Sequence, residues 1–398
     1  MRNFLTKKIT EIQPSGIRKF FDIVSEQPDA LSLGVGEPDF DTPSHMMREG
    51  VRSLQEGRTF YTANAGLLEL REKISEYLAF RNKVHYDPQS EIVVTVGGSE
   101  AIDLALRIFI DPGDEVIIPQ PSFVCYEPIT QMAGGTPVPI DLQAANQFML
   151  TPEELEGAIT AKSKILILSY PNNPTGATMD REALIKIADV VKKHDLLVIT
   201  DEIYAELVYD EHFTSIAELP EMRERTIVIN GFSKGFAMTG WRLGFMAGPE
   251  IFMEQLLKLH QYTIMAAPTA SQYAALAGLK NNWQETVEPM RLSYEERRNY
   301  LHHALEQMGL PCYKAKGAFY LFPEIRQFGL SSEEFALRLL AEEKLAVVPG
   351  SAFGQSGEGF LRLSYAYSIK ELKEAIRRLE RFIQRLQEQA ISVSTEPY

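Results

Sequence analysis

With 398 residues, 45% of them hydrophobic and 24% charged, the chain is long enough for about two domains or for one large domain with an appendage. Its net charge of −14 argues against a nucleic-acid partner, because nucleic-acid phosphates demand a basic face, whereas a small anionic ligand depends only on local groups. The two cysteines, Cys125 and Cys312, exclude a disulfide scaffold and favour a reducing cytoplasm.

The N-terminal residues 1–13 alternate charged with apolar side chains and lack the continuous apolar core of an export signal. No segment approaches the roughly 20 consecutive apolar residues that a membrane-spanning helix needs. We therefore expect a cytoplasmic protein without a membrane partner.

Strand-like apolar runs alternate with helix-like segments through the middle of the chain. The predicted helices include 100–110 and 180–194, and the predicted strands are 91–96, 115–119, 164–169, 196–200, 226–229 and 243–247. Alternation of this kind predicts an α/β fold with a mainly parallel sheet covered by helices on both faces.

The pattern changes at about residue 289. A long charged helix is followed by hairpin-like strands around 317–322, an amphipathic helix over 368–389 and a frayed tail at 391–398. We predict a large domain over 46–288, and a smaller α+β domain that combines 1–45 with 289–398.

Ligands of open parallel sheets bind beyond the carboxyl ends of the strands, so the residues that follow each predicted strand are candidate site residues. Gly98, Ser99 and Glu100 follow the first strand at a helix N-terminus. Free amides and a hydroxyl there can bind an anion, although most junctions of this kind are plain helix caps.

Two further strand ends carry polar side chains. The turn 170–176 has two prolines and a glycine, and holds Asn172 and Asn173 rigidly, either at a site or in a surface turn. Asp201 follows the apolar strand 196–200, where an unpaired carboxylate is costly. It therefore either faces a cationic partner or starts a helix.

Lys234 lies just beyond the apolar strand 226–229, in a segment rich in glycine. Burying an unpaired ammonium is costly, but a lysine that forms an imine no longer needs to be a cation. Schiff-base chemistry with a carbonyl compound is therefore one interpretation, and an ordinary solvated loop lysine is the other.

Seven segments occur in an order that matches one family. They are 36–43 (GEPDFDTP), 61–66 (YTANAG), 173–176 (NPTG), 201–204 (DEIY), 233–242 (SKGFAMTGWR), 349–354 (PGSAFG) and 362–364 (RLS). Over nearly the whole chain the sequence resembles the class I/II aminotransferases of the aspartate aminotransferase superfamily, which have fold type I and use pyridoxal 5'-phosphate.

The resemblance implies a role for each candidate near the cofactor ring. Lys234 is expected to form the imine and to shuttle a proton, and Asp201 to pair with the pyridinium nitrogen, so that the ring becomes an electron sink. Asn173 and Tyr204 are expected to hydrogen-bond the phenolic oxygen, and Phe123 to stack on the ring or, alternatively, to be a core phenylalanine.

The same resemblance assigns the cofactor's phosphate to a set of donors and one cation: Gly98, Ser99, Glu100, Ser233 and Arg242. Gly231 stands where the family often has a further hydroxyl, so one phosphate contact is expected to be missing.

The substrate and the neighbouring subunit have their own candidates. Arg362, within an alternating strand, matches the arginine that grips the substrate α-carboxylate, with Asn173 and the Gly36 backbone beside it. An outward, solvated arginine is the alternative. Tyr61 matches a tyrosine that reaches the phosphate of the neighbouring subunit, which implies a homodimer with shared active sites. No metal site is expected.

The expected function is amino transfer from an L-amino acid to a 2-oxo acid, with 2-oxoglutarate as the expected acceptor and a ping-pong mechanism. Aspartate, aromatic amino acids, alanine and an acylated diaminopimelate precursor remain alternative donors, since neither Arg18 nor Lys19 lies in a motif that identifies a second carboxylate-binding cation. A carbon–sulfur lyase or related enzyme is an alternative, and a non-catalytic cofactor-binding regulator is a remote one.

Overall fold

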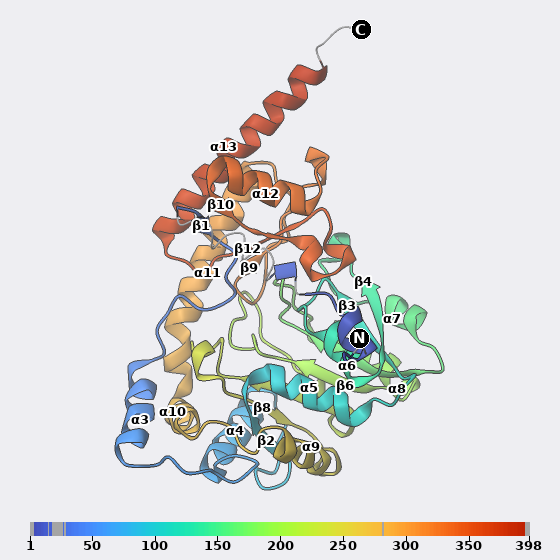
Figure 1. Cartoon of the computed structure of the whole chain (residues 1–398), viewed down its shortest axis with the longest axis vertical. Coiled ribbons are helices and arrows are strands. Elements are labelled where there is room, and N and C mark those ends of the chain that lie inside the picture. The colour runs from blue at the N-terminus through green and yellow to red at the C-terminus, as the bar shows by residue number, and fades with distance from the viewer. Residues whose placement is uncertain (1–3, 15, 18–26, 28, 281, 395–398) are drawn as a thin grey trace.

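The computed structural model describes residues 4–14, 16–17, 27, 29–280 and 282–394. Figure 1 shows a large lobe built around one sheet, a smaller lobe above it, and a C-terminal helix that projects away from the smaller lobe. Helix α11 (Trp283–Gln307) runs along one side of both lobes. Within the described ranges, no helix is long and apolar enough to cross a membrane.

The large lobe contains a seven-stranded sheet with the order β2-β8-β7-β6-β5-β3-β4. Strands β7, β6, β5, β3 and β4 are parallel to one another, and β8 is antiparallel to both of its neighbours. The predicted mainly parallel sheet is confirmed, and each predicted strand overlaps an observed one. The strands are β2 (Ile92–Thr95), β3 (Glu115–Gln120), β4 (Thr136–Asp141), β5 (Ser163–Ser169), β6 (Leu197–Asp201), β7 (Thr226–Gly231) and β8 (Gly244–Ala247).

The edge strand β4 was not predicted. Its sequence carries Pro137 and Pro139, which cannot donate hydrogen bonds to a sheet, and such a run argues against a central strand. The structure resolves the conflict by placing β4 at the edge, where it pairs in parallel with β3 alone.

Helices cover both faces of the sheet, because successive residues of a strand point to opposite sides. Ile165 and Ile167 pack in one core with α5, α6 and α9, whereas Leu166 and Leu168 pack in another with α7 and α8. At the β2 edge, α4 and α10 share a third core with Ile92. The helices of this lobe are α3 (Ser44–Gln55), α4 (Leu68–Arg81), α5 (Gly97–Phe109), α6 (Tyr126–Ala133), α7 (Pro152–Ala158), α8 (Arg181–Lys193), α9 (Glu250–Thr263) and α10 (Thr269–Leu279), and the short α1 (Lys7–Glu11) packs against α6.

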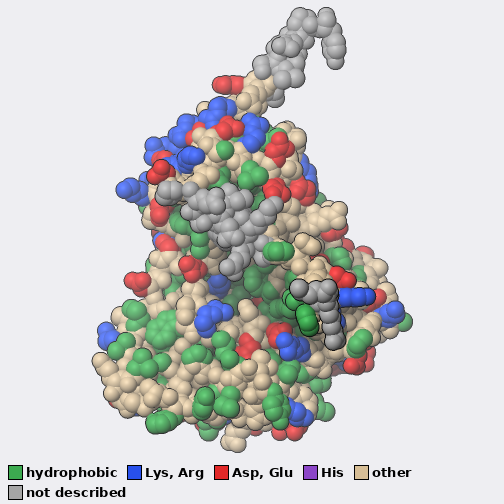
Figure 2. Space-filling model, in the orientation of Figure 1, with side chains coloured by type: hydrophobic (Ala, Val, Ile, Leu, Met, Phe, Trp, Pro, Cys, Tyr) green, Lys and Arg blue, Asp and Glu red, His purple; other side chains and the backbone are tan. Residues whose placement is uncertain are grey.

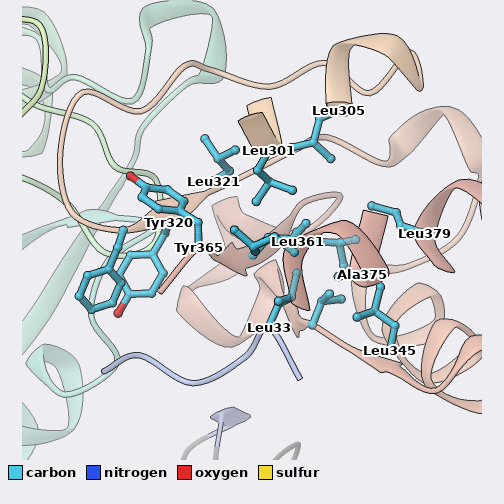
Figure 3. Close-up of a cluster of buried hydrophobic side chains, with 14 of the residues drawn as sticks. Leu33, Leu301, Leu305, Tyr320, Leu321, Leu345, Leu361, Tyr365, Ala375 and Leu379 are labelled. Atoms are coloured by element: carbon cyan, nitrogen blue, oxygen red, sulfur yellow. The ribbon is translucent and has the colours of Figure 1, made fainter. Parts of the chain in front are cut away.

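The small lobe combines the N-terminal segment with the C-terminal part of the chain. Figure 3 shows Leu33 in one cluster with leucines of α11, of α13 and of three short strands. Strand β1 pairs in parallel with β10, and a second, antiparallel sheet has the order β11-β12-β9. The elements are β1 (Leu31–Ser32), β9 (Tyr320–Leu321), α12 (Ser332–Glu343), β10 (Leu345–Ala346), β11 (Val348–Pro349), β12 (Leu361–Ser364) and α13 (Ile369–Ser394).

Helix α11 contributes to both lobes. Val287 packs with the core at the β2 edge of the large lobe, and Met290 packs with the core of the small lobe. The predicted boundary between residues 288 and 289 therefore falls inside one continuous helix, at the point where its packing partner changes. The division into domains 46–288 and 1–45 plus 289–398 remains a prediction.

Helix α13 extends beyond the predicted end at residue 389 to Ser394. Figure 2 shows Lys and Arg side chains gathered over the small lobe, where α13 lies. Arg381 and Arg385 of this helix form ion pairs with Glu343 of α12 at 2.5 and 2.6 Å. These ion pairs add little to the apolar packing of α13, whose Leu379 and Phe382 share a core with α12.

Candidate active site

A cavity of about 350 Å³ lies at the carboxyl ends of β5 and β6, where Ser169 and Asp201 form part of its wall. Tyr320 and Arg362 of the small lobe close it from the other side. Its size is within the roughly 300–1,000 Å³ typical of ligand pockets. The predicted site residues that line it are Gly36, Gly98, Ser99, Phe123, Asn173, Asp201, Tyr204, Ser233, Lys234, Arg242 and Arg362.

Lys234 projects into this cavity from the segment that follows β7. Its Nζ donates a hydrogen bond to the carbonyl oxygen of Gly36 at 2.5 Å. Burial, reinforced by the nearby Arg362 guanidinium, lowers the pKa of the Lys234 ammonium from 10.5 to about 8. At pH 7, roughly one in ten Lys234 side chains is then a neutral amine, compared with less than about one in a thousand for an ordinary lysine.

Asp201, the last residue of β6, is buried and receives two hydrogen bonds. The Tyr126 hydroxyl donates to its Oδ2 at 2.8 Å, and the Ile203 amide donates to its Oδ1 at 3.2 Å. Burial raises the pKa of the Asp201 carboxyl in spite of these donors. A carboxylate in this state is stabilised by a cation, so the cavity favours a positively charged group beside Asp201.

The start of α5 is a candidate anion site. Gly98 and Ser99 line the cavity in the first turn of α5, whose backbone amides have no partner inside the helix. The guanidinium of Arg242 lies so close that a Cβ on Gly97 would come within 3.1 Å of its Nη2. A cation and the positive end of a helix at one place attract an anion.

Arg362 in β12 is buried, with 2% of its surface exposed. Its Nη1 donates to Asn173 Oδ1 at 3.0 Å, its Nη2 donates to the Gly34 carbonyl at 2.5 Å, and its Nε has no partner among the described residues. The guanidinium also lies 4.4 Å from the Tyr320 ring centroid. A buried cation held by neutral groups needs an anionic ligand, and a guanidinium binds a carboxylate well.

The remaining wall is aromatic. Phe123 packs edge-on against Tyr126, and the Tyr204 hydroxyl lies 2.8 Å from the Tyr320 hydroxyl. Sequence reasoning missed Tyr126 and Tyr320 as site residues. For Tyr126 a signal existed, since it lies three residues after the candidate Phe123 and a buried tyrosine usually needs a partner for its hydroxyl. For Tyr320 no local pattern distinguished a site residue from a core aromatic.

Two predicted residues do not line the cavity. The Glu100 carboxylate turns back to the Val96 amide and to His260, which leaves only its backbone near the site. Tyr61 is 82% exposed on a surface loop. Arg18 and Lys19 lie outside the described residues.

Comparisons with known proteins point to one family. The family model "Aminotransferase class I and II" matches residues 28–379. YugH of Bacillus subtilis (strain 168) is 52% identical over 96% of this chain and 99% of its own length. Aromatic-amino-acid aminotransferase 2 of Thermococcus litoralis is 46% identical over 95% and 98% of the two chains. The structure of aspartate aminotransferase from Thermus thermophilus with maleate is similar with a TM-score of 0.91, at 35% identity and over 96% and 100% of the two chains.

Proposed function

The chain belongs to the class I and II aminotransferases and uses pyridoxal 5'-phosphate, and from this premise we propose that it moves the amino group of an L-amino acid to 2-oxoglutarate at the cavity between the two lobes. The observation that carries the proposal is Arg362, a buried guanidinium that donates only to neutral groups and whose Nε has no partner among the described residues. The α-carboxylate of an amino acid or a 2-oxo acid supplies the missing anion.

The residues of the cavity fit the cofactor by their chemistry. When bound, the cofactor supplies an aldehyde and a ring that draws electrons from the substrate's α-carbon. Lys234 offers the neutral amine that an aldehyde requires, and Asp201 is a buried carboxylate that needs a cation. We propose that Gly98, Ser99, Ser233 and Arg242 hold the phosphate, and that Phe123 covers one face of the ring.

In the proposed mechanism, each side chain acts on a defined atom. Arg362 fixes the substrate carboxylate against Asn173 and the Gly36 backbone, so that the α-carbon lies near Lys234. Lys234 Nζ would take the proton from the α-carbon and deliver it to the carbon that comes from the cofactor's aldehyde, because its lowered pKa suits both the uptake and the release near neutral pH. Asn173 and Tyr204 would donate to the cofactor's phenolic oxygen, and Asp201 would hold a proton on the cofactor's ring nitrogen.

The proposed role of Lys234 predicts how its reactivity depends on pH. Reductive methylation of the cofactor-free protein with formaldehyde should label Lys234 with a midpoint near pH 8, because only the neutral amine reacts. Below that midpoint, the rate should fall about tenfold per pH unit. Peptide mapping measures the label at each pH. A midpoint near 10.5, the ordinary value, would contradict the burial argument.

The choice of donor is expected to follow the charge of the cavity wall. The cations that line it among the described residues are Lys234, Arg242 and Arg362, and each already has a proposed partner. A second substrate carboxylate would therefore lose its hydration without a cation in return, whereas an aromatic side chain meets apolar neighbours such as Ile203.

We therefore expect L-phenylalanine or L-tyrosine to exceed L-aspartate by roughly tenfold or more in kcat/KM of the donor half-reaction. This half-reaction is followed from cofactor absorbance, without any acceptor, and compared with alanine and an acylated diaminopimelate precursor. A preference for aspartate would contradict this donor order. Release of ammonia or a thiol from the donor alone would instead favour the lyase alternative, which the comparisons do not favour.

The proposal includes a homodimer in the cytoplasm. Phe60, Tyr61 and Tyr262 are large hydrophobic side chains that are more than 80% exposed in a single chain. Asn64 donates to the carbonyl of Met265 at 2.9 Å, which joins the loop of Phe60 and Tyr61 to the segment just after α9, the helix that carries Tyr262. Exposed apolar surfaces of this kind are typical of protein interfaces, and a second copy would bring its Tyr61 toward the neighbouring phosphate site.

A further inference from the structure

A contact between a glutamate and a histidine joins the first turn of α5 to the last turn of α9, just outside the cavity wall. Glu100 Oε1 lies 2.8 Å from His260 Nδ1, and Glu100 Oε2 accepts a hydrogen bond from the Val96 amide at 2.5 Å. The His260 side chain is completely buried, and its Nε2 has no partner among the described residues. Neither side chain has a part in the mechanism proposed above.

His260 lies where a helix favours a positive charge. It is in the last turn of α9, and its carbonyl oxygen accepts from the amides of Ile264 and Met265 at 3.0 and 3.1 Å. The partial negative charge at a helix C-terminus and the adjacent Glu100 carboxylate both stabilise an imidazolium. An imidazolium at His260 would therefore form a pair with Glu100 that has no net charge.

Glu100 without this partner would oppose anion binding. Its carboxylate occupies the first turn of α5, the same turn whose backbone amides face the cavity at Gly98 and Ser99. A phosphate placed there carries between one and two negative charges, so an unbalanced carboxylate next to it would repel it. The positive end of α5 and Arg242 would then partly compensate the charge of Glu100 instead of the charge of the phosphate.

We propose that His260 is a positioning residue that neutralises Glu100 and so keeps the start of α5 available for the cofactor's phosphate. The inference rests on the proposed placement of the phosphate between α5 and Arg242. It extends that placement to a buried pair that does not touch the cofactor and acts through charge alone.

The test compares two ligands that differ only in the phosphate. Dissociation constants of pyridoxal 5'-phosphate and of pyridoxal are measured for the cofactor-free protein from quenching of its intrinsic fluorescence. His260→Gln keeps a hydrogen-bond donor for Glu100 but removes the charge. It should raise the dissociation constant of pyridoxal 5'-phosphate about tenfold and change that of pyridoxal less than twofold, since only the phosphate would meet the uncompensated carboxylate of Glu100.

Glu100→Gln is the matched control, because it keeps the size of the side chain and the bond to Val96. It should bind pyridoxal 5'-phosphate at least as tightly as the wild type, and Glu100→Gln/His260→Gln should recover affinity to within about threefold of it. Thermal unfolding of the cofactor-free proteins identifies a variant that fails to fold. If His260→Gln fails to fold, the affinity of Glu100→Gln for pyridoxal 5'-phosphate decides the test by itself.

Three results would overturn the inference: equal weakening of both ligands by His260→Gln, a double variant as weak as His260→Gln, or lost affinity in Glu100→Gln. The wild type separately tests the placement of the phosphate. If it binds pyridoxal as tightly as pyridoxal 5'-phosphate, the phosphate placement itself is wrong.

Discussion

Lys234→Ala is expected to lower kcat for transamination by about 10⁴ or more, while pyridoxal 5'-phosphate still binds without a covalent bond. Lys234 lines the cavity, and its pKa of about 8 makes it both a nucleophile and a base near neutral pH. Alanine removes both roles. Single-turnover conversion of the bound cofactor by an amino donor measures the loss, and borohydride reduction with peptide mapping checks that Lys234 carries the label.

Lys234→Arg keeps the positive charge of Lys234 but removes its reactive amine. Arginine preserves a cation beside Gly36 and the Tyr204 ring, but it stays protonated at every working pH and forms no bond to the aldehyde. We expect this variant to be as inactive as Lys234→Ala. Activity within tenfold of the wild type would mean that Lys234 acts as a positioned charge.

Asp201→Asn is expected to lower kcat by about 10² to 10⁴. Burial raises the pKa of the Asp201 carboxyl in spite of the nearby Lys234, so a cation placed directly beside this carboxylate would stabilise it. Removing one partner of a buried ion pair costs about 3–5 kcal/mol, and each 1.4 kcal/mol is a factor of ten. Because asparagine cannot hold the proton on the ring nitrogen, the ring would no longer draw electrons effectively. Rates of the donor half-reaction under saturating cofactor measure the effect.

Two further variants test whether the activity lost in Asp201→Asn depends on the carboxylate of Asp201. Asp201→Glu keeps the charge and should retain more activity than Asp201→Asn. Tyr126→Phe removes one hydrogen bond to the carboxylate and should lower kcat by about 10 to 100-fold, the value of a bond to a charged group. An Asp201→Asn variant within tenfold of the wild type would exclude the proposed pairing.

The large lobe follows from local signals in the sequence. Its parallel strands are buried on both faces, so they are nearly continuous apolar runs that stand out between helices. Strand β4 was the exception, because Pro137 and Pro139 are compatible only with an edge that no local pattern reveals. The two-residue strands β1, β10 and β11 were also beyond local reasoning, since Leu31 pairs with Leu345 across most of the chain.

The residues of the candidate site also fall into two groups, those that local sequence reveals and those that only the tertiary structure reveals. Gly98, Asn173, Asp201 and Lys234 follow predicted strands, and the ends of parallel strands meet at one edge, so their convergence on one cavity was foreseeable. The resemblance to a family supplied their expected roles, whereas Tyr126 and Tyr320 became site residues only through contacts across the fold.

The sequence by itself determined which chemical groups are present and in what order they follow the strands, because strand formation and the residues at strand ends are local properties. Only the tertiary structure decided the state of those groups. The lowered pKa of Lys234, the unpartnered Nε of Arg362 and the pairing of Glu100 with His260 depend on burial and on neighbours distant in sequence. Desolvation and charge compensation arise only when the two lobes and their helices enclose the cavity.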